Sequence, residues 1–376
     1  MELDELRKSL DGIDKRLLDA FFERMKVVAD IAEVKREQGL ALYHPARERE
    51  ILARVGAEGG EELGSYARVL FTTLMSLSRT YQARLSGAGS DTLGALDAAM
   101  QQRPMPRGGR IACQGVEGAY SQEACLKMFP DADILFFKNF DAVFAAVESG
   151  LCQFGVLPAE NSTHGTVGEV YDLMLEHNFS IVKSMKLKIS HALLARRGTS
   201  LKGIKEVYSH EQALGQCAKY LDGKGFATHA VENTAVAAKL VAESERSDIA
   251  AVASKSCADL YDLEVVGEDI QDAGANFTRF ICIAPELRVY PGASKISFVC
   301  TLPHTPGSLH SLISRFAALG LNLTKLESRP IPGRDFEFRF YFDMEADLLD
   351  PQVRSLVAEL ETLTEQFRFL GAYTEA

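Results

Sequence analysis

Hydrophobic side chains recur with two different periods along this 376-residue chain, and the change of period divides it. Over residues 3–37 leucine, isoleucine and valine return every third or fourth position, which predicts one helix of about 50 Å at 1.5 Å per residue. A second helix is expected from Pro45 and a third over residues 63–85. The first helix is too long to be covered by residues 1–86 alone, so we expect it to pack against another chain.

A linker at residues 87–109 precedes a stretch in which short apolar runs alternate with amphipathic ones. This alternation over residues 110–284 predicts a mainly parallel sheet, or two. Residues 182–195 are extended and lack a crossover helix, so they are expected to carry the chain from one sheet to the other, giving two lobes and a cleft. Strands are predicted at residues 110–113, 133–137, 154–157, 204–208, 226–230 and 249–252, and helices at residues 121–128, 141–148, 168–176, 211–221, 234–242 and 255–260.

Residues 295–376 follow a short linker at residues 285–294 and contain runs in the order strand, helix, strand, strand, helix, strand. This is the ferredoxin-like pattern. The chain is therefore expected to be multidomain, with an all-α domain at residues 1–86, an α/β domain at residues 110–284 and an α+β domain at residues 295–376.

Composition and charge narrow the class of protein. With 47% hydrophobic and 25% charged residues, the chain is typical of a globular protein of two or three domains. Its net charge of -11 argues against nucleic acid or an anionic membrane as the main partner. No apolar run approaches the ~20 residues of a membrane span, and the acidic start does not resemble a signal peptide, so the cytoplasm is expected. Seven scattered cysteines without a Cys-x-x-Cys pair favour a reducing compartment and predict neither disulfides nor a metal site.

Polar side chains interrupt the apolar stripes of the helical segment. Arg24 occupies a position that the pattern gives to leucine, so it needs an anion, either a glutamate of the fold or a ligand. Lys35 lies three turns along nearly the same face and could share that ligand. Arg7 is about 42 Å from Lys35 along the helix and could reach the same site only from a partner chain. Ser78 and Gln82, one turn apart on the third helix, imply a polar partner or mutual hydrogen bonding.

With Arg47 and Glu48 these residues stand in family order, and residues 1–86 resemble the helical class of chorismate mutase, an intertwined dimer. The resemblance implies that arginines hold the two carboxylates of chorismate, while Lys35 and Gln82 donate hydrogen bonds to the ether oxygen that gains charge during rearrangement to prephenate. No acid, base, metal or cofactor is required. His44 stands where many relatives carry an acid; a neutral imidazole accepts a hydrogen bond and an imidazolium does not, so mutase activity is expected to fall at acid pH.

Polar residues also gather in the central segment. Pro158 is expected to end the strand at residues 154–157, and a helix resumes near Thr166. Residues 160–163 would then lie between a strand's carboxyl end and a helix N-terminus, which favours an anion; a capped turn is the structural alternative. The other candidates follow later strands or a glycine-rich turn, or interrupt an apolar strand: Ser121, Ser209, Gln216, Thr278 and Arg279.

Three motifs, Glu160-Asn161-Ser162-Thr163, Ser209-His210 and Thr278-Arg279-Phe280, resemble those of prephenate dehydratase in order. The resemblance implies loss of carbon dioxide and water from prephenate, giving phenylpyruvate, with Thr278 as the main catalytic residue. Because a threonine hydroxyl is a weak acid, we expect Thr278 to hydrogen-bond the leaving group while Glu160, partly protonated in a closed cleft, supplies charge. Arg279 is expected to bind a carboxylate or to pair with a structural acid. Substrate-binding residues would be Ser121, Asn161, Ser162, Thr163, Ser209, Gln216 and Arg279.

Two motifs in the last segment resemble the phenylalanine-binding motifs of the regulatory ACT domain: Gly307-Ser308-Leu309-His310, where relatives usually have Gly-Ala-Leu-Val, and Glu327-Ser328-Arg329-Pro330. The resemblance implies feedback inhibition by L-phenylalanine and side-by-side pairing of this domain, hence a homodimer or higher homo-oligomer.

Together the three segments resemble the bifunctional chorismate mutase/prephenate dehydratases, or P-proteins, of phenylalanine biosynthesis. The family implies a two-lobed dehydratase domain like that of periplasmic binding proteins. Two alternatives stay open: a monofunctional dehydratase whose helical segment only dimerises, and a non-catalytic amino-acid sensor, against which the Thr278-Arg279-Phe280 strand argues. A prephenate dehydrogenase is disfavoured because no Gly-x-Gly-x-x-Gly turn follows the first strand of the central segment.

Overall fold

The computed structural model describes residues 2–272, 274–331, 333–334 and 337–376. It divides into two compact units. Unit 1 comprises Met1–Ala98 and Phe298–Phe369, and unit 2 comprises Ala99–Ser297 and Leu370–Ala376. The strands β12 (Lys295–Thr301) and β15 (Gln366–Glu375) each run across a boundary between the units. Within the described residues no helix combines the length and apolarity that crossing a membrane requires.

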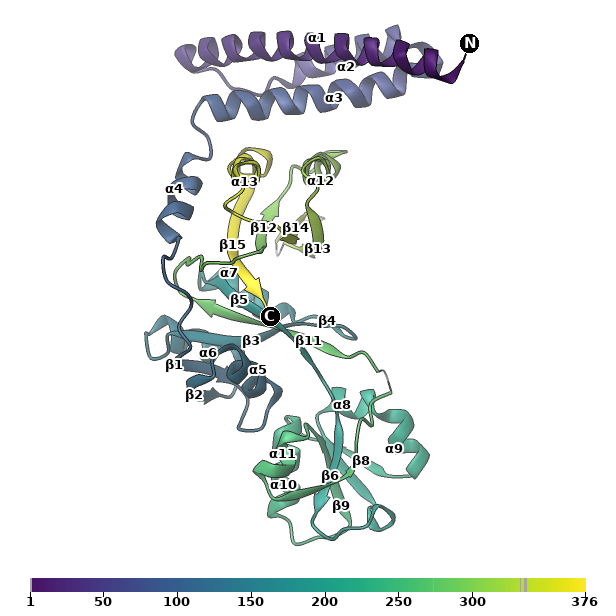
Figure 1. Ribbon diagram of the computed structural model, residues 1–376, viewed down its shortest axis with the longest axis vertical. Coiled ribbons are helices and arrows are strands. Elements are labelled where there is room, and N and C mark those ends of the chain that lie inside the picture. Colours follow the sequence, from purple (N-terminus) through teal and green to yellow (C-terminus); the bar gives the residue numbers. More distant parts are fainter. Residues whose placement is uncertain (1, 273, 332, 335–336) are drawn as a thin grey trace. The chain divides into compact units, whose positions relative to one another are not determined.

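Three long helices, α1 (Leu3–Gln38), α2 (Pro45–Glu58) and α3 (Gly60–Leu85), lie side by side in unit 1 (Figure 1). A capping box of Glu2 and Glu5 begins α1, and Gly39 ends it in the left-handed region with φ of 65°. The predicted long helix is confirmed. Of its residues only Val28 and Ala32 are buried, so the apolar stripe of α1 is left largely exposed. The shorter helix α4 (Ser90–Ala99) follows.

The last part of the chain has the predicted ferredoxin-like order of elements: β12, α12 (Ser308–Ala318), β13 (Asn322–Pro330), β14 (Phe338–Glu345), α13 (Pro351–Leu363) and β15. Its strands follow one another in the sheet as β13-β14-β12-β15, which confirms the prediction. Phe298, Phe316 and Phe342 form the aromatic core below the helices, with ring centroids of Phe298 and Phe342 4.9 Å apart. Arg315 of α12 donates hydrogen bonds to Thr80 (2.9 Å) and to a second hydroxyl of α3, so these helices pack together inside unit 1.

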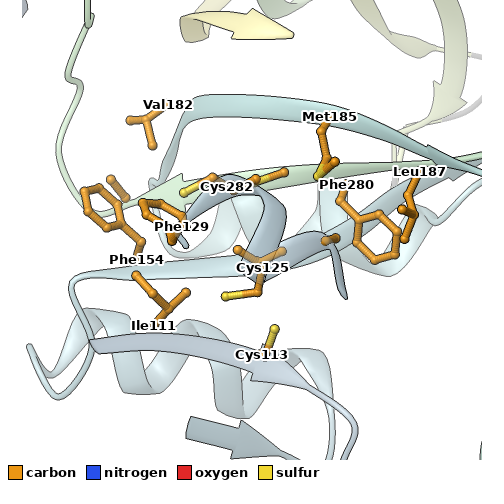
Figure 2. Close-up of a cluster of buried hydrophobic side chains, with 14 of the residues drawn as sticks. Ile111, Cys113, Cys125, Phe129, Phe154, Val182, Met185, Leu187, Phe280 and Cys282 are labelled. Atoms are coloured by element: carbon orange, nitrogen blue, oxygen red, sulfur yellow. The ribbon is translucent and has the colours of Figure 1, made fainter. Parts of the chain in front are cut away.

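The first sheet of unit 2 combines β1 (Gly108–Gln114), β2 (Asp131–Phe137), β3 (Phe154–Asn161), β5 (Ser180–Lys188) and β11 (Phe277–Ala284) with the end of β15, in the order β15-β5-β11-β3-β1-β2. Helices α5 (Tyr120–Met128), α6 (Phe140–Glu148) and α7 (Gly168–Glu176) cover it. Its core contains Cys113, Cys125 and Cys282 beside the stacked rings of Phe129 and Phe154, 5.5 Å apart (Figure 2).

The second sheet of unit 2 has the order β10-β6-β9-β7-β8, built from β6 (Ala192–Arg196), β7 (Glu206–Ser209), β8 (Ala227–Ala230), β9 (Ile249–Ala253) and β10 (Leu263–Gly267). Its helices are α8 (Glu211–Gln216), α9 (Ala218–Lys224), α10 (Thr234–Glu243) and α11 (Ser256–Leu260), with a 3-10 turn at Leu201–Gly203. The chain passes directly from β5 in one sheet to β6 in the other, which confirms the predicted crossing and the two lobes. The expected single helix over residues 211–221 is instead broken at Cys217.

Both sheets of unit 2 are mixed, whereas mainly parallel sheets were predicted. The strands that carry the chain between the lobes enter the sheets without a crossover helix: β11 is antiparallel to both β3 and β5, and β6 is antiparallel to β9 and β10. Direct crossings reverse the strand direction, whereas parallel pairs need a long crossover connection. The predicted parallel pairs are present at β1, β2 and β3 and at β7, β8 and β9.

The predicted end of β3 at Pro158 is wrong, because the strand continues to Asn161. The ladder with β11 changes register here, Phe280 pairing with Pro158 and Arg279 with Glu160. Such an irregularity lets a residue without an N–H remain in a central strand. The two-residue strand β4 (Gly165–Thr166) then pairs back onto the end of β3. A hairpin therefore separates the polar motif from α7, and the expected helix N-terminus beside residues 160–163 is absent.

Candidate active sites

The hydroxyl of Thr278 is held by the side chain of Asn161, its partner across the β3–β11 ladder. Asn161 Nδ2 donates to Thr278 Oγ1 over 2.9 Å. The amide of Asn161 can have only this orientation, because its Oδ1 accepts from the backbone N–H groups of Thr163 (3.0 Å) and His164 (3.1 Å). Since Thr278 Oγ1 accepts this bond, its own hydrogen remains available to donate to a bound molecule.

The same hydrogen-bond network extends to the second lobe. Asn161 Nδ2 also donates to Asn276 Oδ1 (2.9 Å), and Asn276 Nδ2 donates to Gln216 Oε1 (2.9 Å). Gln216 Nε2 in turn lies 3.3 Å from Thr163 Oγ1. The structure thus brings together four predicted residues, Thr278, Asn161, Thr163 and Gln216. Asn276 was missed by the sequence analysis, although it stands directly before the strand that carries Thr278.

Of the three other predicted hydroxyl residues, two bond to the backbone through their side chains. Ser162 Oγ accepts the backbone N–H of Phe277 (2.9 Å), which ties the hairpin to β11. Ser209 is fully buried and donates to the carbonyl of Val252 (2.6 Å) in the second sheet. Ser121 is buried near the start of α5, where its carbonyl accepts from a cysteine thiol. The hydroxyls of Ser162 and Ser209 are therefore occupied by backbone partners.

Arg279 lies on the opposite face of β11 from Thr278, because neighbouring residues of a strand alternate. It is 6% exposed, donates to the hydroxyl of Tyr373 and lies 3.6 Å from a carboxylate oxygen of Glu375. Glu160 pairs with it across the ladder, with 3.8 Å between guanidinium and carboxylate. The guanidinium is thus engaged by structural acids, which was the alternative to a substrate carboxylate. Glu160 shares that face and is not placed beside Thr278.

Glu375 is the centre of a charge cluster at the end of β15. Lys295 and Lys186 donate to its carboxylate over 2.7 and 3.1 Å, beside Arg279. Burial acts to raise the pKa of Glu375, but the two ammonium groups outweigh it and hold the pKa below its usual value. The C-terminal strand is therefore bonded by charge to the strand that carries Thr278.

In unit 1 the structure brings together Arg24, Ser78 and Gln82. The half-buried guanidinium of Arg24 donates to the Ser78 hydroxyl and to the carbonyl of Leu74 (3.4 Å), and burial lowers its pKa. Among the described residues no carboxylate pairs with it, so of the two predicted partners the glutamate is not found. The buried Oε1 of Gln82 has no hydrogen-bond partner there, while its Nε2 donates to the Ser78 carbonyl (3.2 Å). Lys35 donates to the carbonyl of Leu42 (2.7 Å).

The other predicted mutase residues have partners of their own. Glu48 pairs with Arg79, a residue that the sequence analysis missed although it adjoins Ser78 on α3. His44 caps α2, its Nδ1 accepting the backbone N–H of Arg47 (3.2 Å). The side chain of Arg47 is exposed and pairs with Glu50.

Arg7 lies far from the other mutase residues within one chain. It is exposed and pairs with Asp4. It precedes Arg24 on α1 by a distance of about 26 Å along the helix.

The first effector motif lies at a cavity of about 400 Å³ in unit 1. Gly307 begins α12 in the left-handed region with φ of 88°, and Ser308 and Leu309 line the cavity. His310 is exposed beside Ser314. The second motif, Glu327-Ser328-Arg329-Pro330, forms the end of the edge strand β13, where Glu327 pairs with Lys325. Other residues of the cavity wall are Thr301, Leu302, Pro303, His304, Phe338 and Phe340.

Comparison with known proteins agrees with this division of the chain. Residues 6–83 match the family model of chorismate mutase type II, and residues 111–287 match that of prephenate dehydratase. A bifunctional chorismate mutase/prephenate dehydratase of Stutzerimonas stutzeri is 31% identical over 100% of this chain and 98% of its own. An arogenate dehydratase/prephenate dehydratase 2, chloroplastic, of Arabidopsis thaliana is 41% identical over 70% of this chain and 72% of its own.

A solved structure, a prephenate dehydratase in complex with L-Phe from Arthrobacter aurescens, superposes with a TM-score of 0.64 at 28% identity and covers 70% of this chain and 89% of that one. Both catalytic families are thus present on one chain, as in the full-length relative. The protein rearranges chorismate to prephenate and converts prephenate to phenylpyruvate by dehydration and decarboxylation. By its identity over the full length of the Stutzerimonas enzyme and by both family models, the chain belongs to the bifunctional chorismate mutase/prephenate dehydratases.

Proposed function

We propose that Thr278 donates the hydrogen bond that stabilises the hydroxyl group leaving prephenate. The supporting observation is that Asn161, fixed by backbone donors, gives its amide hydrogen to Thr278 Oγ1. The Thr278 hydrogen must then point to another acceptor, and a departing hydroxyl that gains negative charge is a strong one. Aromatisation of the ring drives the loss of carbon dioxide. Gln216 and Thr163 lie on the same network and are assigned to orienting the substrate.

Isosteric substitution of Thr278 tests this assignment. Thr278→Val keeps the shape and removes the donor, and should lower the dehydratase kcat about 100-fold or more. Thr278→Ser keeps a hydroxyl and should retain much of the rate. The mutase rate of the same preparation reports on folding and should stay unchanged. Wild-type dehydratase activity in Thr278→Val would overturn the proposal.

We assign Glu160 and Arg279 to holding β11 in register and not to the chemical step. The support is their shared face, opposite Thr278, and the pairing of Arg279 with Glu375 and Tyr373. Arg279→Lys should then lower the free energy of unfolding of unit 2 and leave the KM for prephenate nearly unchanged. A large KM increase at unchanged stability would instead mean that Arg279 binds a substrate carboxylate.

For the mutase we propose that Arg24 and Lys35 hold chorismate, and that Gln82 completes the site. Two observations favour a polar ligand at this point. Arg24 has no carboxylate partner among the described residues, and the buried Oε1 of Gln82 has no hydrogen-bond partner there. Gln82 Nε2 donates one hydrogen to the Ser78 carbonyl, and its second hydrogen is assigned to the ether oxygen in the transition state. Gln82→Ala should therefore lower kcat for chorismate while dehydratase activity persists.

We infer that the active mutase is a homodimer joined along α1. Leu3, Leu10 and Leu17 are each more than half exposed, as are further apolar residues of the same helix. An apolar stripe of this length is covered when two copies pair, and pairing would bring the partner's Arg7 toward Arg24. Sedimentation of the full chain at micromolar concentration tests the inference, since a monomer would contradict it.

We propose that residues 295–376 form an ACT-type domain that binds L-phenylalanine and inhibits the dehydratase. The support is the cavity of about 400 Å³ beside Ser308 and Leu309, with apolar walls from Phe338 and Phe340, and the L-Phe complex named for the Arthrobacter relative. Millimolar L-phenylalanine should lower the dehydratase rate. Leu309→Trp would fill the cavity and should abolish the inhibition, whereas Leu349→Trp, at an exposed site, should not.

Two further assignments rest on similarity and composition. The 41% identity to an arogenate dehydratase/prephenate dehydratase makes arogenate a second candidate substrate, which a comparison of kcat/KM for prephenate and arogenate would test. The seven cysteines are free and buried, which supports a reducing compartment, the cytoplasm, as the site of action.

A further inference from the structure

His191 is a buried histidine that none of the roles above includes. It is 2% exposed and lies in the short connection between β5 and β6, where the chain crosses between the lobes. Its Nε2 lies 2.8 Å from Gln216 Oε1, and its Nδ1 lies 3.2 Å from the hydroxyl of Tyr120. Its backbone N–H donates to the side chain of Gln271 (2.9 Å). The imidazole thus contacts both lobes and touches the network that ends at Thr278.

The directions of the hydrogen bonds in this network follow from one fixed end. The backbone donors at residues 163 and 164 require Asn161 to face them with Oδ1, so its Nδ2 donates to Asn276 Oδ1. Asn276 must therefore offer its Nδ2 to Gln216, whose Oε1 accepts. An accepting Oε1 requires a hydrogen on the other neighbour, and that neighbour is His191 Nε2. Each amide orientation is set by the one before it.

The far side of the imidazole is consistent with this tautomer. Burial lowers the pKa of His191, so the ring is neutral near pH 7 and carries a single hydrogen. With that hydrogen on Nε2, Nδ1 is an acceptor and faces the Tyr120 hydroxyl. The single hydrogen of this hydroxyl lies between two acceptors, the Ser190 carbonyl (2.6 Å) and Nδ1 (3.2 Å), and the shorter distance is to the carbonyl. The tautomer is therefore set on the Nε2 side, by the accepting oxygen of Gln216.

We propose that His191 is a positioning residue of the dehydratase: its Nε2–H fixes Gln216 and, through Asn276 and Asn161, keeps the Thr278 hydroxyl hydrogen directed at the substrate. Two ends anchor the network, the backbone donors of the hairpin in one lobe and His191 at the crossing between the lobes. Without His191, the backbone donors still hold Asn161 Oδ1, but Gln216 loses a donor and can turn away from Asn276, so the network is then anchored at one end only. The inference rests on Thr278 acting as the donor.

Two variants of His191 and one matched control test the proposal in the full-length enzyme. His191→Phe keeps a planar ring and removes the donor. His191→Gln returns an amide N–H near the position of Nε2. His177→Leu is the control, because His177 is another mostly buried histidine of unit 2, stacked on Phe144, and has no contact with the network.

We expect His191→Phe to lower the dehydratase kcat at least about tenfold, with a smaller change in KM and an unchanged mutase rate. His191→Gln should recover most of kcat, and His177→Leu should retain it. The double variant His191→Phe with Gln216→Leu should be no slower than Gln216→Leu alone, since both act through one bond. A merely structural role would predict independent losses in the double variant and no rescue by glutamine.

The result also separates this inference from the assignment of Thr278. An inactive Thr278→Val beside a fully active His191→Phe overturns the positioning role and leaves Thr278 in place. An active Thr278→Val overturns the assignment of Thr278 and the inference with it. If His191→Phe does not fold, His191→Leu takes its place: a tenfold lower kcat that His191→Gln restores supports the proposal, and an unchanged kcat in a stably folded His191→Leu contradicts it.

Discussion

The mutase sites are expected to be shared between two chains, and mixing two inactive variants would reveal this. On α1, Arg7 is about 26 Å from Arg24 and about 42 Å from Lys35 along the helix axis, and the helix is continuous between them. No arginine side chain spans such a distance. If Arg7 contributes to the site, it must come from an antiparallel copy of α1, which the exposed apolar stripe makes possible.

The expected yield follows from the symmetry of a twofold dimer. Arg7→Ala and Lys35→Ala should each abolish most mutase activity, about 100-fold or more, since each removes a cation from every site. In a mixed dimer one site combines the intact Lys35 of one chain with the intact Arg7 of the other, and the second site carries both lesions. Random re-pairing makes about half of the dimers mixed, so about a quarter of wild-type mutase activity should return.

The assay is chorismate turnover before and after the two variants are unfolded in urea and refolded together. Dehydratase activity, which neither substitution touches, normalises each sample for refolded enzyme. A mixture of wild type with Arg7→Ala serves as the matched control for exchange. If heterodimers form, as tags of different mass would show, and no mutase activity returns, Arg7 does not act from the partner chain and the reasoning is wrong.

Three further predictions concern charge. Between pH 7 and 5 the free energy of unfolding should fall less in His191→Gln than in wild type, as denaturant titrations would measure. The pKa of His191 is lower in the folded than in the unfolded protein, so its contribution to stability is present above the unfolded value of about 6.5 and is lost as pH falls through the folded pKa. Glu375→Ala should lower the free energy of unfolding by about 3 kcal/mol, since it leaves Lys295 and Arg279 buried without their shared carboxylate; a loss under 1 kcal/mol in thermal unfolding would contradict this. His44→Asp should keep the cap of α2, because an aspartate oxygen accepts the Arg47 N–H as the imidazole nitrogen does; a clearly lower free energy of unfolding in His44→Asp would exclude the capping argument.

The long elements were predictable because their patterns are local. The period of α1 predicted its end to within one residue of the observed Gln38, and the extended stretch at residues 182–195, which has no crossover helix, predicted the two lobes. Pro158 does not end β3, because a proline ends a strand only where its missing N–H is needed in the ladder, and the register shift at Phe280 removes that need. Cys217 breaks a helix whose apolar spacing continues through it, and nothing in that spacing marks the break.

The site residues were predictable only where a motif groups them. Thr278, Asn161 and Thr163 belong to two short motifs and lie in contact in the structure. His191 stands alone in the sequence, and Asn276 lies just outside the Thr278-Arg279-Phe280 motif. Only the meeting of the two crossing segments places them beside Gln216. The partner of Arg279 could not be predicted from the sequence either. A buried arginine in a strand requires an anion, but whether a ligand or a distant acid supplies it depends on where β15 ends.

The position of β15 explains why the strand with Thr278 carries a buried arginine next to this threonine. Alternation along β11 turns Thr278 to the amide network and Arg279 to the opposite face, where Tyr373 and Glu375 hold it. Glu375 and Tyr373 of β15 are thus joined to the strand of Thr278 by an ion pair and a hydrogen bond to Arg279. Because Arg279 and Thr278 are adjacent in β11, these contacts also help to hold the backbone at Thr278.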